Sequence, residues 1–100
     1  MNITEINDAE LEDIIHSNPK VVLDCYAPWC GPCRMFSTVF EELSAEDDRI
    51  KFCKLNTDEN PDTAERFDVM SIPTVLIFEN GHLKYRETGV KTKDELQELL

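Results

Sequence analysis

The sequence predicts an α/β protein in which a mixed β-sheet carries helices on both faces. A buried strand over 20–26 and a second strand over 50–55 flank an amphipathic helix that begins near Cys33. Strand, helix and strand at this spacing are typical of a parallel βαβ unit. Asn80-Gly81 separates two later strand segments and is a strong hairpin signal, so these strands are expected to be antiparallel. Parallel and antiparallel pairs together indicate a mixed sheet with helical layers.

The first twenty residues predict a short strand and a helix. Residues 2–6 alternate loosely, as an edge strand does. Asn7 and Glu10 have the spacing of a capping box, although the capping residue is Asn rather than Ser or Thr. Apolar residues follow at helical spacing, and Asn18-Pro19 ends the helix.

The central segment predicts the βαβ unit. Residues 20–26 are short, apolar and β-branched at their start, which indicates a buried strand. The following helix has apolar residues that recur every three or four positions, as one buried face requires. These residues are Met35, Phe36, Val39, Phe40 and Leu43. Residues 50–55 form the next strand.

The last forty residues predict a short helix and the hairpin. Asn60-Pro61 places an N-cap residue before a proline at the first helical position, and this helix extends to about Asp68. Residues 74–78 form a strand, and residues 83–88 return antiparallel to it after the turn.

A final helix begins at a second capping box. Thr92 and Glu95 supply the box, and Leu96, Leu99 and Leu100 supply its apolar stripe. The predicted order of elements is βαβαββα. A chain of 100 residues fits one domain and buries enough surface for one core.

Composition excludes several classes of partner. Asp and Glu number 21 against 10 Lys and Arg, so the net charge is −11. Nucleic acid and anionic membranes offer no counter-charge to such a protein, and the acidity mainly favours solubility. Residues 1–15 hold five acidic side chains and no basic one, unlike a signal peptide. No apolar run approaches the ~20 residues that span a bilayer. These features predict a soluble, cytoplasmic protein.

Cys30 and Cys33 form the candidate catalytic pair. They lie where the buried strand gives way to the amphipathic helix. Residues three apart in a helical turn are about 5–6 Å apart, within the ~4.4–6.8 Å that a disulfide spans, so the pair can close and open with little backbone movement. The positive end of the helix dipole lowers the pKa of Cys30 and increases its thiolate fraction. We therefore predict Cys30 as the nucleophile and Cys33 as the resolving thiol.

Two metal sites are alternatives to this interpretation. A structural zinc site needs a second ligand pair, but Cys25 and Cys53 form no second C-x-x-C, and His16 and His82 have no ligand spacing. The first three cysteines have the C-x4-C-x2-C spacing of a plant-type [2Fe–2S] protein, with Cys53 as a possible fourth ligand. Against this, Cys25 lies within a strand, where its side chain alternates with those of its neighbours. We expect no bound metal.

The segment Trp29-Cys30-Gly31-Pro32-Cys33-Arg34 resembles the active site of the thioredoxin family. Other positions match the family in order, and the likeness covers essentially the whole chain. Among the matching positions, Asp24 stands where the family has a buried carboxylate and Lys54 where it has the partner lysine. Ile72-Pro73-Thr74 matches the family's cis-proline segment, Phe78-Glu79-Asn80-Gly81 its hairpin turn, and Gly89 the glycine beside the catalytic groove.

The resemblance implies a fold and an activity. The fold is one thioredoxin domain over residues 1–100, with a five-stranded mixed sheet and four helices. The activity is reduction of protein disulfides by a Cys30–Cys33 dithiol. Electrons would come from NADPH through a thioredoxin reductase, without a bound cofactor, and the protein would be a monomer.

The expected site has a catalytic part and a binding part. Asp24 is the expected proton acceptor for Cys33, and Lys54 is its partner. The expected substrate-binding residues are Trp29, Gly31, Pro32, Ile72, Pro73 and Gly89.

Two departures from the family pattern bear on specificity. Tyr26 replaces a tryptophan, and Tyr26-Ala27-Pro28-Trp29 is more similar to a protein disulfide isomerase domain. Pro32 brings no charge between the cysteines, however, which favours a reducing pair. Thr38 replaces a proline that kinks the second helix, so this helix should be straighter. The alternatives are a disulfide isomerase or oxidase, and a redox-inactive binding module.

Strand alternation makes predictions for Asp24 and for the other two cysteines. Burial of Asp24 in an apolar strand should raise the pKa of its carboxyl group. Alternation places the side chains of Cys25 and Asp24 on opposite faces of their strand, and those of Cys53 and Lys54 on opposite faces of theirs. If Asp24 and Lys54 share a face, both cysteines share the other. We expect them to be buried, unpaired thiols.

Overall fold

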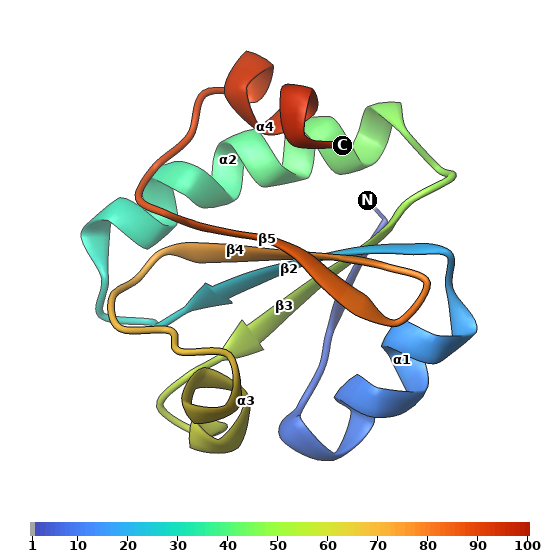
Figure 1. Ribbon diagram of the computed structural model, residues 1–100. Coiled ribbons are helices and arrows are strands. Elements are labelled where there is room, and N and C mark those ends of the chain that lie inside the picture. Colours follow the sequence, from blue (N-terminus) through green and yellow to red (C-terminus); the bar gives the residue numbers. More distant parts are fainter. Residues whose placement is uncertain (1) are drawn as a thin grey trace.

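A five-stranded sheet lies between two layers of helices in the computed structural model, which describes residues 2–100 (Figure 1). The elements in chain order are β1 (Ile3–Glu5), a 3-10 turn η1 (Asp8–Glu10), α1 (Leu11–Ser17), β2 (Lys20–Tyr26), α2 (Gly31–Glu46), β3 (Lys51–Asn56), α3 (Pro61–Arg66), β4 (Thr74–Glu79), β5 (His82–Thr88) and α4 (Lys93–Leu99). The predicted order βαβαββα corresponds to β2 through α4, and the expected strand and helix of the first twenty residues, β1 and α1, precede it.

The strands are arranged in the order β1-β3-β2-β4-β5. β1, β3 and β2 are parallel, as predicted for the βαβ unit, whereas β4 and β5 are antiparallel to their neighbours. β2 therefore lies at the centre of the sheet, and its residues 21–25 are all buried. The carboxyl end of this central strand leads directly into the cysteine pair.

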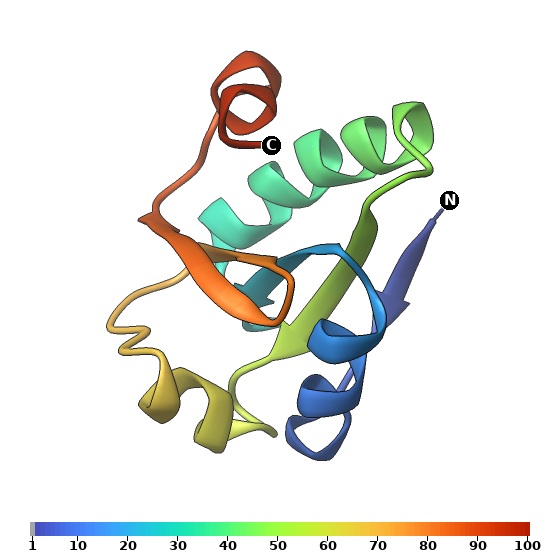
Figure 2. The same cartoon turned by 45° about the vertical axis from the view of Figure 1, so that its right-hand side comes forward.

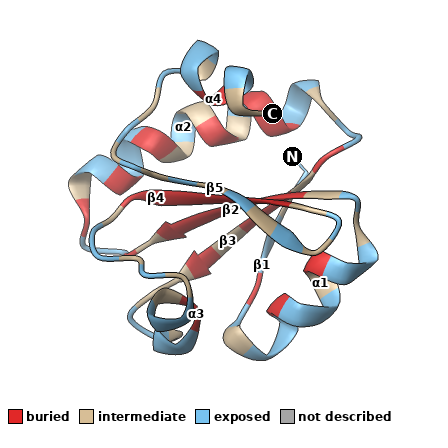
Figure 3. Ribbon diagram, in the orientation of Figure 1, coloured by how far each residue is buried: buried red, intermediate tan, exposed pale blue. Residues whose placement is uncertain are grey.

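Each face of the sheet has its own hydrophobic core. α2 and α4 cover one face, and α1 and α3 cover the other (Figures 1 and 2). On the α2 side, Phe36 and Phe40 pack against Phe52, with Phe40 and Phe52 edge to face. On the α1 side, Leu23 and Leu55 belong to the second core. Buried residues follow the central strands and the inner sides of the helices (Figure 3).

The helix α2 has a narrower buried face than the sequence predicts. Phe36, Phe40 and Leu43 are buried at a spacing of four and three residues. Met35, predicted on the same face, is 66% exposed, so that prediction is wrong. Met35 precedes Phe36 by one position, which is about 100° around the helix, and this rotation turns it toward solvent. α2 is one continuous helix through Thr38.

The start of α3 is capped by a residue far away in the sequence. Asn60 occupies the predicted N-cap position, but its side chain caps no helical N–H group. The carboxylate of Asp8 instead accepts hydrogen bonds from the backbone N–H of Asp62 (3.1 Å) and of Thr63 (2.9 Å), and from the Thr63 hydroxyl (2.6 Å). A carboxylate suits the positive end of a helix dipole. Asp8 thus joins η1 to α3.

The turns and remaining caps agree with the sequence. Asn80 and Gly81 both have positive φ, at 51° and 85°, as a two-residue hairpin turn requires. Both capping boxes form, at Asn7 with Glu10 and at Thr92 with Glu95. Within residues 2–100, no helix has the length and apolarity needed to cross a membrane.

Candidate active site

The cysteine pair lies at the first turn of α2. Cys30 is the N-cap residue with an extended backbone, and Pro32 lies in the first turn, where its missing N–H has no helical partner to lose. Cys30 and Cys33 form a disulfide with a Cα–Cα distance of 5.2 Å. The Sγ of Cys30 also accepts a hydrogen bond from the backbone N–H of Cys33 at 3.2 Å. The helix start therefore directs a backbone N–H at the sulfur of Cys30, where it would stabilise a thiolate.

A groove of about 630 Å³ borders this disulfide on one side. Its walls come from the start of α2, the turn after β3, the helix α3 and the segment that precedes β4. The lining residues are Trp29, Cys30, Gly31, Pro32, Thr57, Ala64, Val69, Met70, Ser71 and Ile72. Cys30 lines the groove and Cys33 does not, so the groove borders only the first cysteine of the pair.

The expected binding residues differ in their relation to this groove. Trp29, Gly31, Pro32 and Ile72 line it, whereas Pro73 and Gly89 do not. The Ile72–Pro73 bond is cis, in agreement with the resemblance. The carbonyl oxygen of Ile72 lies 3.9 Å from the Cys30 Sγ. Gly89, at φ 96°, donates its backbone N–H to the carbonyl of Pro73 at 2.8 Å, and this hydrogen bond holds the proline in place.

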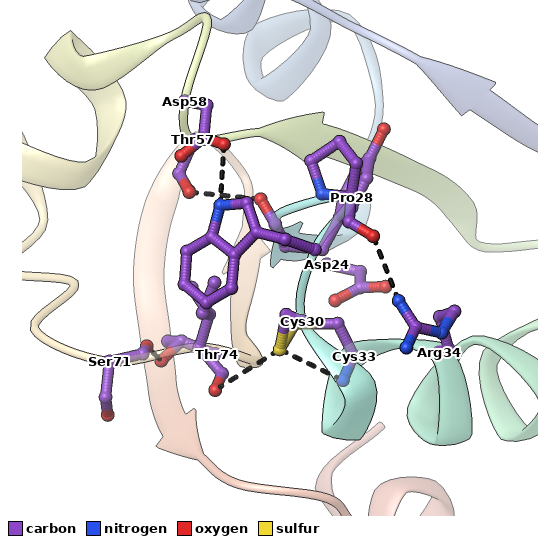
Figure 4. The surroundings of a disulfide bond; sticks show 12 residues. Asp24, Pro28, Cys30, Cys33, Arg34, Thr57, Asp58, Ser71 and Thr74 are labelled. Carbon is purple, nitrogen blue, oxygen red and sulfur yellow. Dashed lines mark hydrogen bonds between the residues drawn. A yellow bond between two sulfur atoms is a disulfide. The ribbon is translucent and has the colours of Figure 1, made fainter.

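The large side chains at the rim of the groove are exposed. Trp29 is 70% exposed, and its indole Nε1–H donates to Asp58 at 2.8 Å (Figure 4). Arg34 donates to the carbonyl of Pro28 at 3.0 Å, which ties α2 to the loop before the cysteines. Met70 is 90% exposed and adds apolar surface to the groove. Two large apolar side chains are therefore exposed at the groove that borders the disulfide.

Asp24 is fully buried on the side of β2 that faces α2 (Figure 4). Its register partner on β3 is Lys54, and the Lys54 Nζ lies 4.0 Å from the Asp24 Oδ2. Neither carboxyl oxygen of Asp24 has a hydrogen-bond partner among residues 2–100. Burial raises the pKa of Asp24 from 3.8 to about 7, because desolvation disfavours the charged form, while the charge of Lys54 lowers the pKa and that of Glu5 raises it.

Several residues of the site carry no signal in the sequence. Met70 and Asp58 belong to loops, and nothing in their local sequence places them beside Trp29. Ser37 belongs to no recognisable sequence motif, yet its hydroxyl accepts a hydrogen bond from the Lys54 ammonium at 2.9 Å. Only chain topology brings these groups to the cysteines.

The alternative metal sites do not fit the geometry. Cys25 and Cys53 belong to the core on the α1 side, whereas Cys30 and Cys33 form a separate cluster with Ala27. The C-x4-C-x2-C spacing therefore does not gather three sulfurs at one point. The part of the chain that the structure describes contains no group of three or more His, Cys, Asp or Glu placed to hold a metal ion.

Cys25 and Cys53 are buried free thiols, which confirms the prediction from strand alternation. Burial raises the pKa of Cys53 to about 11 and raises that of Cys25 further. We expect native thiol titration of the reduced protein to count about two reactive sulfurs, those of Cys30 and Cys33, because buried, protonated thiols react slowly. Denaturation should raise the count to four in reduced protein and to two in oxidised protein. A denatured oxidised count of zero would contradict the assignment.

Comparison with known proteins identifies the family. The model of the thioredoxin family matches residues 2–100. The thioredoxin of Staphylococcus haemolyticus (strain JCSC1435) is 42% identical over 101 residues, which cover 100% of this chain and 96% of that protein. The thioredoxin of Synechocystis sp. (strain PCC 6803) is 42% identical over 98 residues, covering 96% of this chain and 92% of that protein.

The solved structures agree. A single-residue mutant of the thioredoxin of Halobacterium salinarum NRC-1 superimposes with a TM-score of 0.92 at 32% identity, covering 98% of this chain and 87% of that one. The fold and the Cys30–Cys33 disulfide define a thiol–disulfide oxidoreductase that acts on disulfide substrates. With a family model that spans nearly the whole chain, the chain belongs to the thioredoxin family.

Proposed function

We propose that this oxidoreductase reduces protein disulfides with Cys30 as the attacking and Cys33 as the resolving sulfur. The observation that carries the proposal is the asymmetry of the pair. Cys30 lines the groove and accepts a hydrogen bond from the Cys33 N–H at the start of α2, whereas Cys33 does not line the groove. A target disulfide in the groove meets the sulfur whose thiolate the helix start favours.

The proposed reaction has two exchanges. The Cys30 thiolate attacks one sulfur of the target disulfide, and that bond breaks with release of the other target sulfur as a thiolate. Cys33 then loses its proton and attacks the Cys30 Sγ. The bond between Cys30 and the target breaks, and the second target sulfur leaves as a thiolate. Two electrons have passed to the target, and the chain holds the Cys30–Cys33 disulfide.

Asp24 is the proposed acceptor of the Cys33 proton. Its carboxyl group lies buried on the α2 side of the sheet, and its pKa of about 7 is close to neutral pH. A base works best when its pKa lies near the working pH. Lys54, at 4.0 Å, is the proposed partner that keeps the ionised carboxylate tolerable in the core.

The groove is the proposed site for the segment around the target cysteine. Trp29 and Ile72 offer apolar surface in the groove that Cys30 lines, and the neighbouring Gly31 and Pro32 have no bulky side chains. Pro73 and Gly89 form the hydrogen-bonded support behind Ile72. An exposed apolar rim is typical of a surface that binds another protein.

We propose a reducing role, because Pro32 places no charge between the cysteines. Electrons would then come from NADPH through a thioredoxin reductase, with no cofactor bound to this chain. The free thiols of Cys25 and Cys53 suit a reducing compartment such as the cytoplasm. The proposed acting unit is one domain in a monomer. A disulfide isomerase or oxidase remains the alternative, and a redox titration against glutathione separates the two by the potential of the pair.

Alkylation tests the roles of the two cysteines. Iodoacetamide at neutral pH should modify Cys30 of the reduced protein at least about tenfold faster than Cys33, because Cys30 is at the groove and has the stabilised thiolate. Peptide mapping after a short exposure measures both rates. Buried Cys53 in the same digest is the internal control and should remain unmodified. Faster modification of Cys33 would reverse the proposed roles.

A further inference from the structure

Lys54 points toward Asp24 but makes no hydrogen bond to it. The distance of 4.0 Å between the Lys54 Nζ and the Asp24 Oδ2 exceeds the ~3.2 Å limit of an N–H···O hydrogen bond. The ammonium donates instead to the Ser37 hydroxyl, at 2.9 Å. A lysine that could neutralise a buried carboxylate directly is therefore held away from it by a third residue.

Neighbouring side chains enclose most of the Lys54 ammonium. Its Nζ lies 4.7 Å from the centre of the Tyr26 ring, a cation–π contact. The Tyr26 hydroxyl donates a hydrogen bond to the carboxylate of Glu5 in β1 at 2.8 Å, and this bond holds the ring in place. Only 19% of the Lys54 side chain is exposed. Ser37 and Tyr26 thus bound a mostly enclosed position for the charge.

The residues around Asp24 come from several elements, and they determine how well its ionised carboxylate is stabilised. β1 brings Glu5, β3 brings Lys54, and β2 itself brings Tyr26. α2 brings Cys33 together with Ser37, one helical turn later. β4 brings an apolar register partner, Val75. Lys54 is the only cation in this set, so its exact placement decides how strongly the ionised carboxylate is stabilised.

We propose that Ser37 is a positioning residue for the resolving step: its hydroxyl retains the Lys54 ammonium and so leaves Asp24 without a hydrogen bond. This inference rests on the proposed role of Asp24 as proton acceptor. A hydrogen bond from an ammonium favours the ionised carboxylate and lowers its pKa. A carboxylate of low pKa is a poor acceptor for a thiol proton. Ser37 thereby keeps the pKa of Asp24 near neutral, where burial has placed it.

Removing the hydroxyl frees the ammonium to move. An ammonium has three donors, and in Ser37→Ala the Asp24 carboxylate becomes the available buried acceptor. We expect the Asp24 titration midpoint, measured by carbon-13 NMR of its carboxyl group, to fall by about one pH unit. The midpoint of the pH profile for the resolving step, measured in single turnovers with a mixed disulfide at Cys30, should fall equally.

Three further variants separate positioning from general damage to α2. Thr38→Ala removes a hydroxyl from the exposed neighbouring position and should leave both midpoints unchanged. Ser37→Thr retains a hydroxyl and should keep the native midpoints. In a Lys54→Met background, Ser37→Ala should cause no further shift, because the ammonium that it would release is gone.

The outcomes distinguish the inference from the function on which it rests. An unchanged or raised Asp24 midpoint in Ser37→Ala, or an equal shift in the Lys54→Met background, would overturn the role of Ser37. If the Asp24 midpoint falls but the profile of the resolving step does not follow, Ser37 still positions Lys54, and Asp24 is not the proton acceptor.

Discussion

A Cys33→Ser variant is expected to accumulate mixed disulfides between Cys30 and its substrates, because the sulfur that resolves them is absent. Turnover in an insulin-reduction assay with dithiothreitol should fall strongly, while the first exchange continues. Covalent complexes should appear on non-reducing gels and disappear on reduction. Mass spectrometry of the trapped species should place the bond at Cys30, the sulfur that lines the groove.

The matching change Cys30→Ser should abolish both turnover and trapping. Loss of the attacking sulfur should lower the rate by roughly a thousandfold or more, as for other covalent nucleophiles. Cys53→Ala is the control, because Cys53 lies in the core on the opposite face of the sheet and should leave activity near its native level. Trapping through Cys33 in the Cys30→Ser variant would contradict the proposed order of attack.

Asp24→Asn is expected to stabilise the protein in a manner that depends on pH. The folded-state pKa of about 7 is above the ordinary value of 3.8, so the neutral carboxyl favours folding. Native stability is therefore lost as pH rises from about 4 to about 7, and it is level above that range. Asparagine remains neutral throughout. The free energy of unfolding of Asp24→Asn should therefore exceed that of the native protein by an amount that grows across this pH range and reaches about 4 kcal/mol.

Denaturant unfolding of the oxidised protein at several pH values measures this difference. Asp13→Asn, on the exposed surface of α1, records the effect of removing one negative charge from a chain of net charge −11. The variant should also resolve mixed disulfides slowly while attacking substrates at a near-native rate. Equal stability of native protein and Asp24→Asn above pH 7 would show that Lys54 fully compensates the buried charge.

The order of elements was predictable because its signals are local. A capping box, a hairpin dipeptide and an apolar repeat each depend on neighbours a few residues away, and Asn7, Asn80-Gly81 and Thr92 all act as expected. The cysteine pair was predictable for the same reason, since three residues of spacing at a helix start bring two sulfurs together. Alternation along β2 and β3 likewise predicted the buried thiols.

Prediction failed where a contact joins distant segments. Asn60 has the composition of an N-cap, yet Asp8 caps α3, because folding brings a carboxylate from η1 to the same N–H groups. Met35 fits an apolar repeat, but the position of α4 and the sheet decides how wide a face α2 buries.

The fold class, the cysteine pair that forms the disulfide and the buried faces of the central strands were predictable from the sequence, because they follow from local conformation and strand periodicity. The groove and the surroundings of Asp24 depend instead on how distant elements pack together. The Lys54 ammonium could have bonded to Asp24, but the packing of α2 against β3 places the Ser37 hydroxyl nearer to it. Such a choice between two acceptors depends on distances of a few ångströms between elements, and no local pattern in the chain specifies them.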